Sequence, residues 1–157
     1  MRIALSLPID APAELVFATL SDIQAYAKAV PHIEDIAFLS ETRTGLGTRF
    51  RETRRTGGTV MTTELEVTEF VENARQRLVA DSHGTVWDTL FVVAPRNGAS
   101  ELSVTMEARA YAVLAKLAMP AMKSAIGEAI ERDMAAVKAY CERLAGQQGR
   151  APEAKTA

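Results

Sequence analysis

The chain contains 157 residues, of which 48% are hydrophobic, and it carries a formal net charge of -2 at pH 7. This length favours one domain with a sizeable buried core. The slightly acidic balance excludes a general electrostatic attraction to nucleic acid or to anionic membranes, because such binding needs a concentrated excess of Lys and Arg. We therefore expect no nucleic-acid partner.

Neither the cysteine content nor the first residues tie the chain to an oxidising compartment. Cys141 is the single cysteine, so it cannot form an intramolecular disulfide. Asp10 and Pro12 interrupt the opening apolar run before a signal-peptide core could form. No other run approaches the ~20 apolar residues of a membrane span. We expect a cytoplasmic protein without an integral membrane segment.

The first 30 residues predict one strand followed by two short helices. Apolar residues alternate with polar or small ones from 2 to 9, which is the period of a half-buried strand. The segment DAPAELVFATLSD has Pro12 at a first helical position and Glu14 in the first turn, and both favour a helix. A second helical segment, DIQAYAKAV, ends before Pro31.

From Ile33 to about Ala110 the sequence predicts a meander of strands separated by short turns. Asn97-Gly98 and Gly57-Gly58 give the clearest hairpin signals, because these residues tolerate positive φ. Such short connections predict that consecutive strands pair in antiparallel fashion. The expected strands cover residues 35–41, 47–55, 60–70, 75–82, 85–94 and 100–110.

A long helix is expected between Tyr111 and Leu144, where Ala, Leu, Met, Glu and Lys predominate before Gly146. Its apolar residues recur at intervals of three, four or seven, so they form one stripe that should lie against an apolar surface. The stripe comprises Leu114, Leu117, Met122, Ile126, Ile130, Val137, Cys141 and Leu144.

Two residues disturb this helix. Pro120 cannot donate a backbone hydrogen bond, so we expect it to separate a short helix from the main one. Gly127 costs about 1 kcal/mol relative to alanine inside a helix, and we expect it to allow close packing on the sheet, with room for a ligand as the alternative. Residues 146–157 have no apolar periodicity and are expected to form a flexible tail.

The order of the elements and several short segments resemble a known superfamily. The segments are the opening strand with IDAPAELVFATLSDIQAY, then GLGTRFR, TELEVTEF, WDTLFVVAP and DMAAVKAYCERL. Together they resemble the START-like helix-grip superfamily (SRPBCC), in its polyketide cyclase/dehydrase and lipid transport branch, over residues 1–145. The resemblance implies a single α+β domain. In it, a seven-stranded antiparallel curved sheet wraps around the long C-terminal helix and leaves an elongated apolar cavity.

The segment RFRETRR raises the question of which strand face turns inward, since successive side chains point to opposite faces. Phe50 must be the inward residue because the other face is wholly polar, and Glu52 shares the face of Phe50. An unpaired charge in an apolar interior costs several kcal/mol, so Glu52 should be protonated, paired, hydrated or near a cavity opening. The wholly polar face comprises Arg49, Arg51, Thr53 and Arg55.

Two interpretations of Glu52 stay open. In the first, it forms a structural ion pair with Arg54 or with a residue of a neighbouring strand, as most perturbed charges do. In the second, it helps to orient a ligand in an otherwise apolar pocket. The polar residues that would share this second role are Thr63, Thr89, Tyr26 and His32.

The cavity implied by the resemblance would be lined by inward residues of the strands and of the long helix. Methionines among them could adapt to the shape of a ligand, although a plain core role is the alternative. The expected ligand-binding residues are Tyr26, Phe50, Glu52, Thr63, Leu65, Trp87, Thr89, Phe91, Met106, Met119, Met122 and Ile126.

No motif of metal, phosphate or nucleophilic chemistry is present in the sequence. His32, His83 and Cys141 are widely separated, so we expect no metal site and no cofactor. The glycine pairs are not followed by a helix that could bind phosphate, and there is no G-x-S-x-G segment. Glu52 and His32 are the candidates for proton transfer if the protein is an enzyme.

We interpret the sequence as a domain that binds, transports or senses a hydrophobic or amphipathic small molecule, such as a lipid, an isoprenoid or a polyketide-like aromatic. The alternative is a cyclase, aromatase or dehydratase that uses the same cavity. A third interpretation is a protein-interaction module that docks an acidic partner through a basic patch. The patch comprises Arg43, Arg49, Arg51 and Arg55.

Overall fold

The computed structural model describes residues 1–149, and these residues form seven strands and three helices. The fold is the α+β helix-grip arrangement that the sequence predicts. In chain order the elements are β1 (Arg2–Ile9), α1 (Ala13–Ser21), α2 (Ile23–Ala29), β2 (Ile33–Phe38), β3 (Arg49–Thr56), β4 (Thr59–Val71), β5 (Arg75–Ser82), β6 (Thr85–Arg96), β7 (Ala99–Ala110) and α3 (Val113–Gln148).

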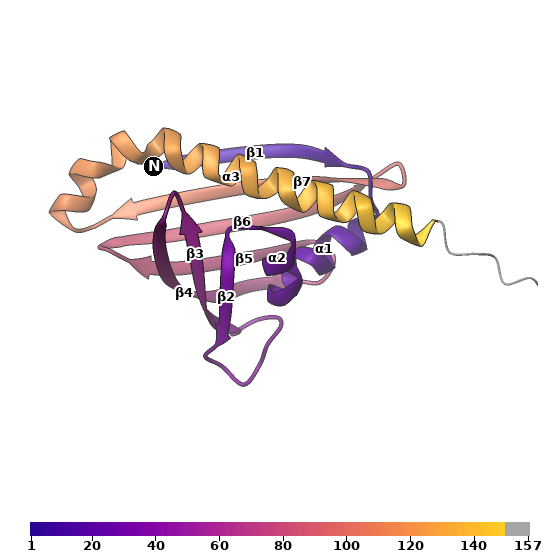
Figure 1. Cartoon of the computed structure of the whole chain (residues 1–157), viewed down its shortest axis with the longest axis horizontal. Helices are drawn as coiled ribbons and strands as arrows, with labels where there is room; N and C mark the ends of the chain where they lie inside the picture. The colour runs from indigo at the N-terminus through magenta and orange to yellow at the C-terminus, as the bar shows by residue number, and fades with distance from the viewer. Residues whose placement is uncertain (150–157) are drawn as a thin grey trace, which may run out of the picture.

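All seven strands belong to one antiparallel sheet with the spatial order β1-β7-β6-β5-β4-β3-β2. The meander from β2 to β7 follows from its short turns, in which Gly57, Gly58 and Asn97 adopt positive φ. Because α1 and α2 follow β1, the first strand pairs with the last one rather than with β2. Figure 1 shows the sheet curving beneath α3.

The two short helices close one end of the sheet. Asp22 ends α1 and caps α2, since its carboxylate accepts hydrogen bonds from the backbone N–H of Gln24 and Ala25 at 3.0 and 3.1 Å. Both helices lie close to the C-terminal part of α3 (Figure 1). The sheet, the short helices and α3 therefore enclose a core at this end.

Helix α3 differs from the sequence prediction at Pro120 and at its end. The prediction of a break at Pro120 was wrong, because a single helix runs from Val113 to Gln148 with Pro120 inside it. Proline deprives the Lys116 carbonyl of its helical partner, and Figure 1 shows that the helix changes direction near its N-terminal end. The helix also continues through Gly146, so only residues 150–157 of the expected tail lie outside the described residues.

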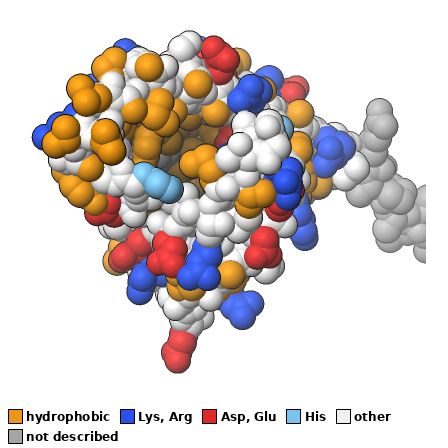
Figure 2. Space-filling view, turned by 60° about the vertical axis from the view of Figure 1, so that its left-hand side comes forward, with side chains coloured by type: hydrophobic (Ala, Val, Ile, Leu, Met, Phe, Trp, Pro, Cys, Tyr) orange, Lys and Arg blue, Asp and Glu red, His pale blue; other side chains and the backbone are white. Residues whose placement is uncertain are grey.

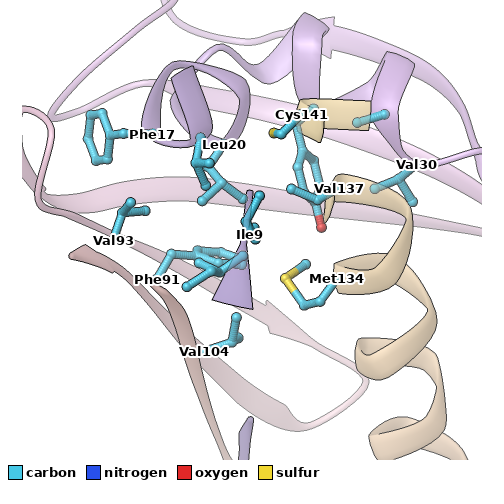
Figure 3. Close-up of a cluster of buried hydrophobic side chains, with 14 of the residues drawn as sticks. Ile9, Phe17, Leu20, Val30, Phe91, Val93, Val104, Met134, Val137 and Cys141 are labelled. Atoms are coloured by element: carbon cyan, nitrogen blue, oxygen red, sulfur yellow. The ribbon is translucent and has the colours of Figure 1, made fainter. Parts of the chain in front are cut away.

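The core lies at the end that α1 and α2 close. Figure 3 shows side chains of β1, α1, β6, β7 and α3 converging there, with Phe91 facing Met134 and Val137. Aromatic rings add edge-on contacts, with the Phe17 and Phe70 centroids 5.4 Å apart. The largest fully buried side chains of the molecule include Ile9, Val16, Ile23, Val30, Phe50, Val67, Leu102, Met134, Val137 and Cys141.

The opposite end of α3 is not covered. Leu114 and Leu117 are 81% and 74% exposed, and Met122 is 45% exposed, although the sequence stripe predicts that all of them face an apolar surface. That prediction was wrong for the first turns of the helix because no described element packs on these side chains. The fold therefore has one end closed by α1 and α2 and one end at which α3 is uncovered.

This asymmetry predicts unequal costs for the same substitution. Leu102→Ala should lower the free energy of unfolding by about 2–5 kcal/mol, because Leu102 is fully buried and its removal leaves a cavity. Leu117→Ala, the matched control on the exposed part of α3, should cost less than about 0.5 kcal/mol. Urea denaturation measures both. Equal losses of unfolding free energy in the two variants would contradict the conclusion that the first turns of α3 are uncovered.

Candidate functional site

The inward face of the sheet is continuous across five strands. One transverse row joins paired residues of β4, β5, β6, β7 and β1 in register, and it comprises Val67, Leu78, Thr89, Met106 and Ile3. On the same face of β4, Leu65 pairs with Phe50 of β3, and Thr63 pairs with Glu52. The strand alternation therefore places the predicted inward residues on one face.

The large inward side chains near the middle of the sheet are less buried than those at the end closed by α1 and α2, although the small side chains Thr85, Ala80 and Ala108 beyond them are buried. Phe91 and Val93 of β6 are buried beside α1, whereas Trp87 and Thr89 of the same strand face are only half-buried. Met106 of β7 is half-buried as well. Because a packed interior would bury such residues, the space between this part of the sheet and α3 is not filled.

This space is a hollow that opens at the uncovered end of α3. Figure 2 shows the opening with hydrophobic side chains gathered around and inside it. We call these surroundings the rim. Its exposed apolar side chains comprise Met61, on the inward face of β4 next to the β3–β4 turn, and Tyr111, Val113, Leu114, Leu117 and Met122 at the start of α3.

The β5–β6 turn belongs to the rim through backbone hydrogen bonds. The Gly84 carbonyl accepts from the N–H groups of Tyr111 and Ala112, at 2.9 and 3.1 Å. His83 is the exposed residue of this turn with positive φ, and the Tyr111 hydroxyl donates to Asp81 at 2.9 Å. These bonds fix the β5–β6 turn against the start of α3.

A groove of about 480 Å³ adjoins the rim between α3 and the β1–β7 edge of the sheet. It combines apolar side chains with three cationic residues. The lining residues are Met1, Ala108, Arg109, Ala110, Lys116, Met119, Pro120 and Lys123.

A buried cluster of charges lies between the hollow and the core. Arg54 of β3 donates from its Nε to Glu52 of the same strand and from a terminal nitrogen to Asp133 of α3. Tyr26 of α2 is buried and its ring contacts Phe91 edge-on, with centroids 6.4 Å apart. We call Tyr26, Glu52, Arg54 and Asp133 the ion cluster.

The electrostatics of the ion cluster keep Tyr26 protonated and Arg54 charged. Burial raises the pKa of the Tyr26 hydroxyl well above its usual range, and the neighbouring Arg54 guanidinium only partly offsets this effect. Burial opposes the charge of Arg54, but the neighbouring carboxylates of Glu52 and Asp133 outweigh it, so the pKa of Arg54 lies above its usual range. The cluster thus presents hydrogen-bond donors that do not titrate near neutral pH.

The ion cluster marks the boundary between the dry core and the hollow. On β3, Phe50 is buried on the core side of Glu52, while the side chain of Arg54 retains 30% exposure on the side of the β3–β4 turn. On α3, Met134 is buried beside Asp133, whereas Ile126 is only half-buried. Arg54 is the member of the cluster that most nearly reaches the hollow.

The structure confirms the interpretation of Glu52 as a member of a structural ion pair. Glu52 faces inward with 7% exposure and pairs with Arg54, as the first interpretation states. Thr63 lies directly opposite Glu52 in the sheet, and Tyr26 joins the same cluster. His32 does not: its side chain is exposed before β2, and its carbonyl accepts from the Arg55 N–H.

Asp133 was missed by the sequence analysis although a signal was present. It lies three residues after Ile130 and four before Val137, which places a carboxylate on the apolar stripe of the helix. An acidic residue in that position needs a buried partner. Since Glu52 and Arg54 also face inward, Asp133 could have been expected to meet them.

Two further interpretations change with the structure. A Cβ atom at Gly127 would meet no heavy atom within 4 Å, so the expectation of close packing on the sheet was wrong and open space remains beside it. The basic patch is partly neutralised, because Arg51 pairs with Glu64 and Arg55 with Glu34. Arg43 lies over the Phe38 ring at 5.1 Å.

Neither a metal cluster nor a membrane span is found in the described part of the chain. Within residues 1–149, no group of three or more His, Cys, Asp or Glu side chains is arranged to hold a metal ion. No helix in the same range has both the length and the apolar character needed to cross a bilayer.

Comparison with solved structures shows a helix-grip domain. A START superfamily protein from Mycobacterium smegmatis shares 20% identity, with a TM-score of 0.74 over 91% of this chain and 98% of the other. The protein TTHA0849 from Thermus thermophilus shares 15% identity, with a TM-score of 0.75 over 90% and 97%. The di-domain ARO/CYC protein StfQ, from the steffimycin biosynthetic pathway, shares 14% identity, with a TM-score of 0.77 over 92% and 51%.

The sequence itself gives the family. Residues 1–142 match the family described as polyketide cyclase / dehydrase and lipid transport, and the chain belongs to this family. The resemblance drawn from the sequence segments is thereby confirmed. A search of curated protein sequences gave no match.

The ion cluster predicts that Arg54 is needed for stability. Arg54→Met should lower the free energy of unfolding by about 3 kcal/mol, because Glu52 and Asp133 lose their shared partner. This value is near the lower end for buried ion pairs because the Arg54 side chain is partly exposed. Urea denaturation at neutral pH measures the change.

Two further variants separate charge from packing. Arg51→Met, on the same strand as Arg54, removes an exposed pair with Glu64 of β4 and should cost less than about 1 kcal/mol. Combining Arg54→Met with Glu52→Gln and Asp133→Asn should recover most of the loss, because no unpaired charge then remains. An Arg54→Met loss no greater than that of Arg51→Met would contradict the role of the cluster.

Proposed function

We propose that the hollow binds a hydrophobic or amphipathic small molecule, such as a lipid, an isoprenoid or a polyketide-like aromatic. One observation carries the proposal: inward side chains of the sheet, including Trp87, Thr89 and Met106, stay half-buried opposite a helix whose first turns are uncovered. An unfilled apolar space with a few polar groups is typical of a ligand site. The family description, which joins cyclase and lipid transport, supports the same class of ligand.

Affinity in this site would come from apolar burial. Leu65, Trp87, Met106 and Ile126 retain exposed apolar surface that a ligand would cover, at about 25 cal/mol per Å² of surface removed from water. Methionine side chains on the lining, such as Met106, can adjust to different ligand shapes at low cost. These properties favour a long or flat apolar body.

Specificity would come from the ion cluster at the inner end of the hollow. Arg54 and the protonated Tyr26 are hydrogen-bond donors, so the polar end of the ligand should carry an acceptor such as a carbonyl, hydroxyl or carboxylate oxygen. Glu52 and Asp133 hold the Arg54 side chain in place and leave it less free to move. Thr63, opposite Glu52, adds a hydroxyl group.

A substitution that fills the hollow should weaken binding. Met106→Trp places a larger side chain within the inward row, so the affinity for the neutral apolar dye N-phenyl-1-naphthylamine should fall at least about tenfold, or ~1.4 kcal/mol. Thr105→Trp is the matched control, because Thr105 lies on the opposite face of the same strand. Dye fluorescence measures both affinities.

Equal dye affinity in the two variants would contradict binding in the hollow. The natural occupant can be sought separately by native mass spectrometry of gently purified protein followed by organic extraction. A co-purifying apolar compound that the Met106→Trp protein lacks would support a carrier.

A second candidate function is catalysis in the same space, and the composition of the ion cluster favours it. Tyr26, Arg54 and two carboxylates converge from α2, β3 and α3, although no single sequence segment predicts such a group. Donors held in a buried site can stabilise negative charge that develops on a carbonyl oxygen of a folded reactive chain. The cavity shape would supply orientation, as in a cyclase or dehydratase.

The catalytic candidate predicts turnover that depends on the ion cluster. A poly-β-ketone or enoyl substrate should be converted by the wild-type protein, and Tyr26→Phe should lower kcat about 100-fold or more while the dye affinity changes little. Glu52→Gln should also lower kcat, whereas His32→Ala, on an exposed residue outside the cluster, should not. If the protein binds the dye but converts none of these substrates, the result would contradict the catalytic function and would agree with the carrier function.

A further inference from the structure

We propose that the rim of the hollow docks onto an anionic lipid surface. The first turns of α3 carry the most exposed large apolar side chains of the described residues, with Val113, Leu114 and Leu117 between 72% and 81% exposed. A helix segment that presents apolar side chains together with lysines is the type that lies in a membrane interface.

Along the chain, the charges nearest these apolar side chains have one sign, although Asp81 accepts a hydrogen bond from Tyr111 and Arg109 lies near Glu107 and Asp88. From Ala108 to Gly127 the sequence contains three cations, Arg109, Lys116 and Lys123, and no Asp or Glu. The same three cations line the groove beside the rim. In a chain of net charge -2, this segment therefore differs from the surface as a whole, and the lack of overall attraction to membranes does not apply to it.

The lysines are also unpaired, unlike most cations of the sheet. Arg75, Arg77 and Arg96 have carboxylate partners within the sheet, whereas neither Lys116 nor Lys123 takes part in an ion pair among residues 1–149. Each lysine near an anionic membrane contributes about a fivefold gain in binding. A lipid headgroup layer supplies many negative charges with apolar chains directly below, so it matches both features of the rim at once.

Docking at the rim would place the opening of the hollow on the bilayer. Met61, on the inward face of β4 next to the β3–β4 turn, is a further exposed apolar side chain, and hydrophobic side chains gather around the opening (Figure 2). An apolar molecule could then pass between the bilayer and the hollow without crossing water, which removes the cost of exposing its apolar surface. This inference goes beyond the proposed function, since docking requires no ligand in the hollow.

Vesicle co-sedimentation of the full chain tests the proposal. We expect binding to phosphatidylcholine vesicles that contain phosphatidylserine, weaker binding at high salt, and little binding to phosphatidylcholine alone. Lys116→Ala with Lys123→Ala should weaken binding about tenfold or more, and Leu114→Ser with Leu117→Ser should do the same. Because these side chains are exposed, the variants should keep their unfolding midpoints.

Matched controls remove equivalent groups elsewhere. Arg49→Ala with Arg132→Ala deletes two exposed cations, and Leu46→Ser deletes an apolar side chain with 67% exposure in the β2–β3 loop; both should bind vesicles like the wild type. Met106→Trp, which blocks the hollow, should also bind vesicles normally, so failure of docking is distinguishable from failure of ligand binding. Equal losses in the controls, no binding to anionic vesicles, or binding to polyglutamate but not to vesicles would overturn the proposal.

Discussion

The structure depends on one constraint, which is that strand alternation turns Glu52 and Arg54 inward together with Phe50. Charges in this position need partners, and α3 supplies Asp133 while α2 supplies Tyr26. The resulting ion cluster separates a dry core on one side from an unfilled space on the other. These charges form their ion pairs with one another, so they are stable without tight packing of the sheet against α3 on the side of the hollow.

The two ends of the molecule follow from this division. At the end closed by α1 and α2, the inward side chains pack against the C-terminal half of α3 in the hydrophobic core. At the other end, the helix bends near Pro120 and leaves its first turns without a partner. The stability of the domain therefore rests on one end, and the other end is free to serve binding.

The sequence predicted the arrangement of elements well, because period-two alternation, glycine turns and the apolar stripe are local signals. It also placed Glu52 on the inward face. It failed where distant residues decide the outcome: the meeting of Asp133 with Arg54 depends on how the helix crosses the sheet, and the exposure of Leu114 depends on the absence of a covering element. The prediction at Pro120 was wrong because the loss of one helical hydrogen bond bends a long helix without ending it.

Trp87 offers the most direct test of the unfilled hollow, because it is the only tryptophan of the chain and lies half-buried on the inward face. Its fluorescence lifetime can be followed with increasing acrylamide, before and after saturation with N-phenyl-1-naphthylamine. The account predicts that acrylamide quenches Trp87 in the free protein and that the dye protects it. A Trp87 lifetime as insensitive to acrylamide as that of a fully buried indole, and unchanged by the dye, would show that side chains fill the space and would contradict the account.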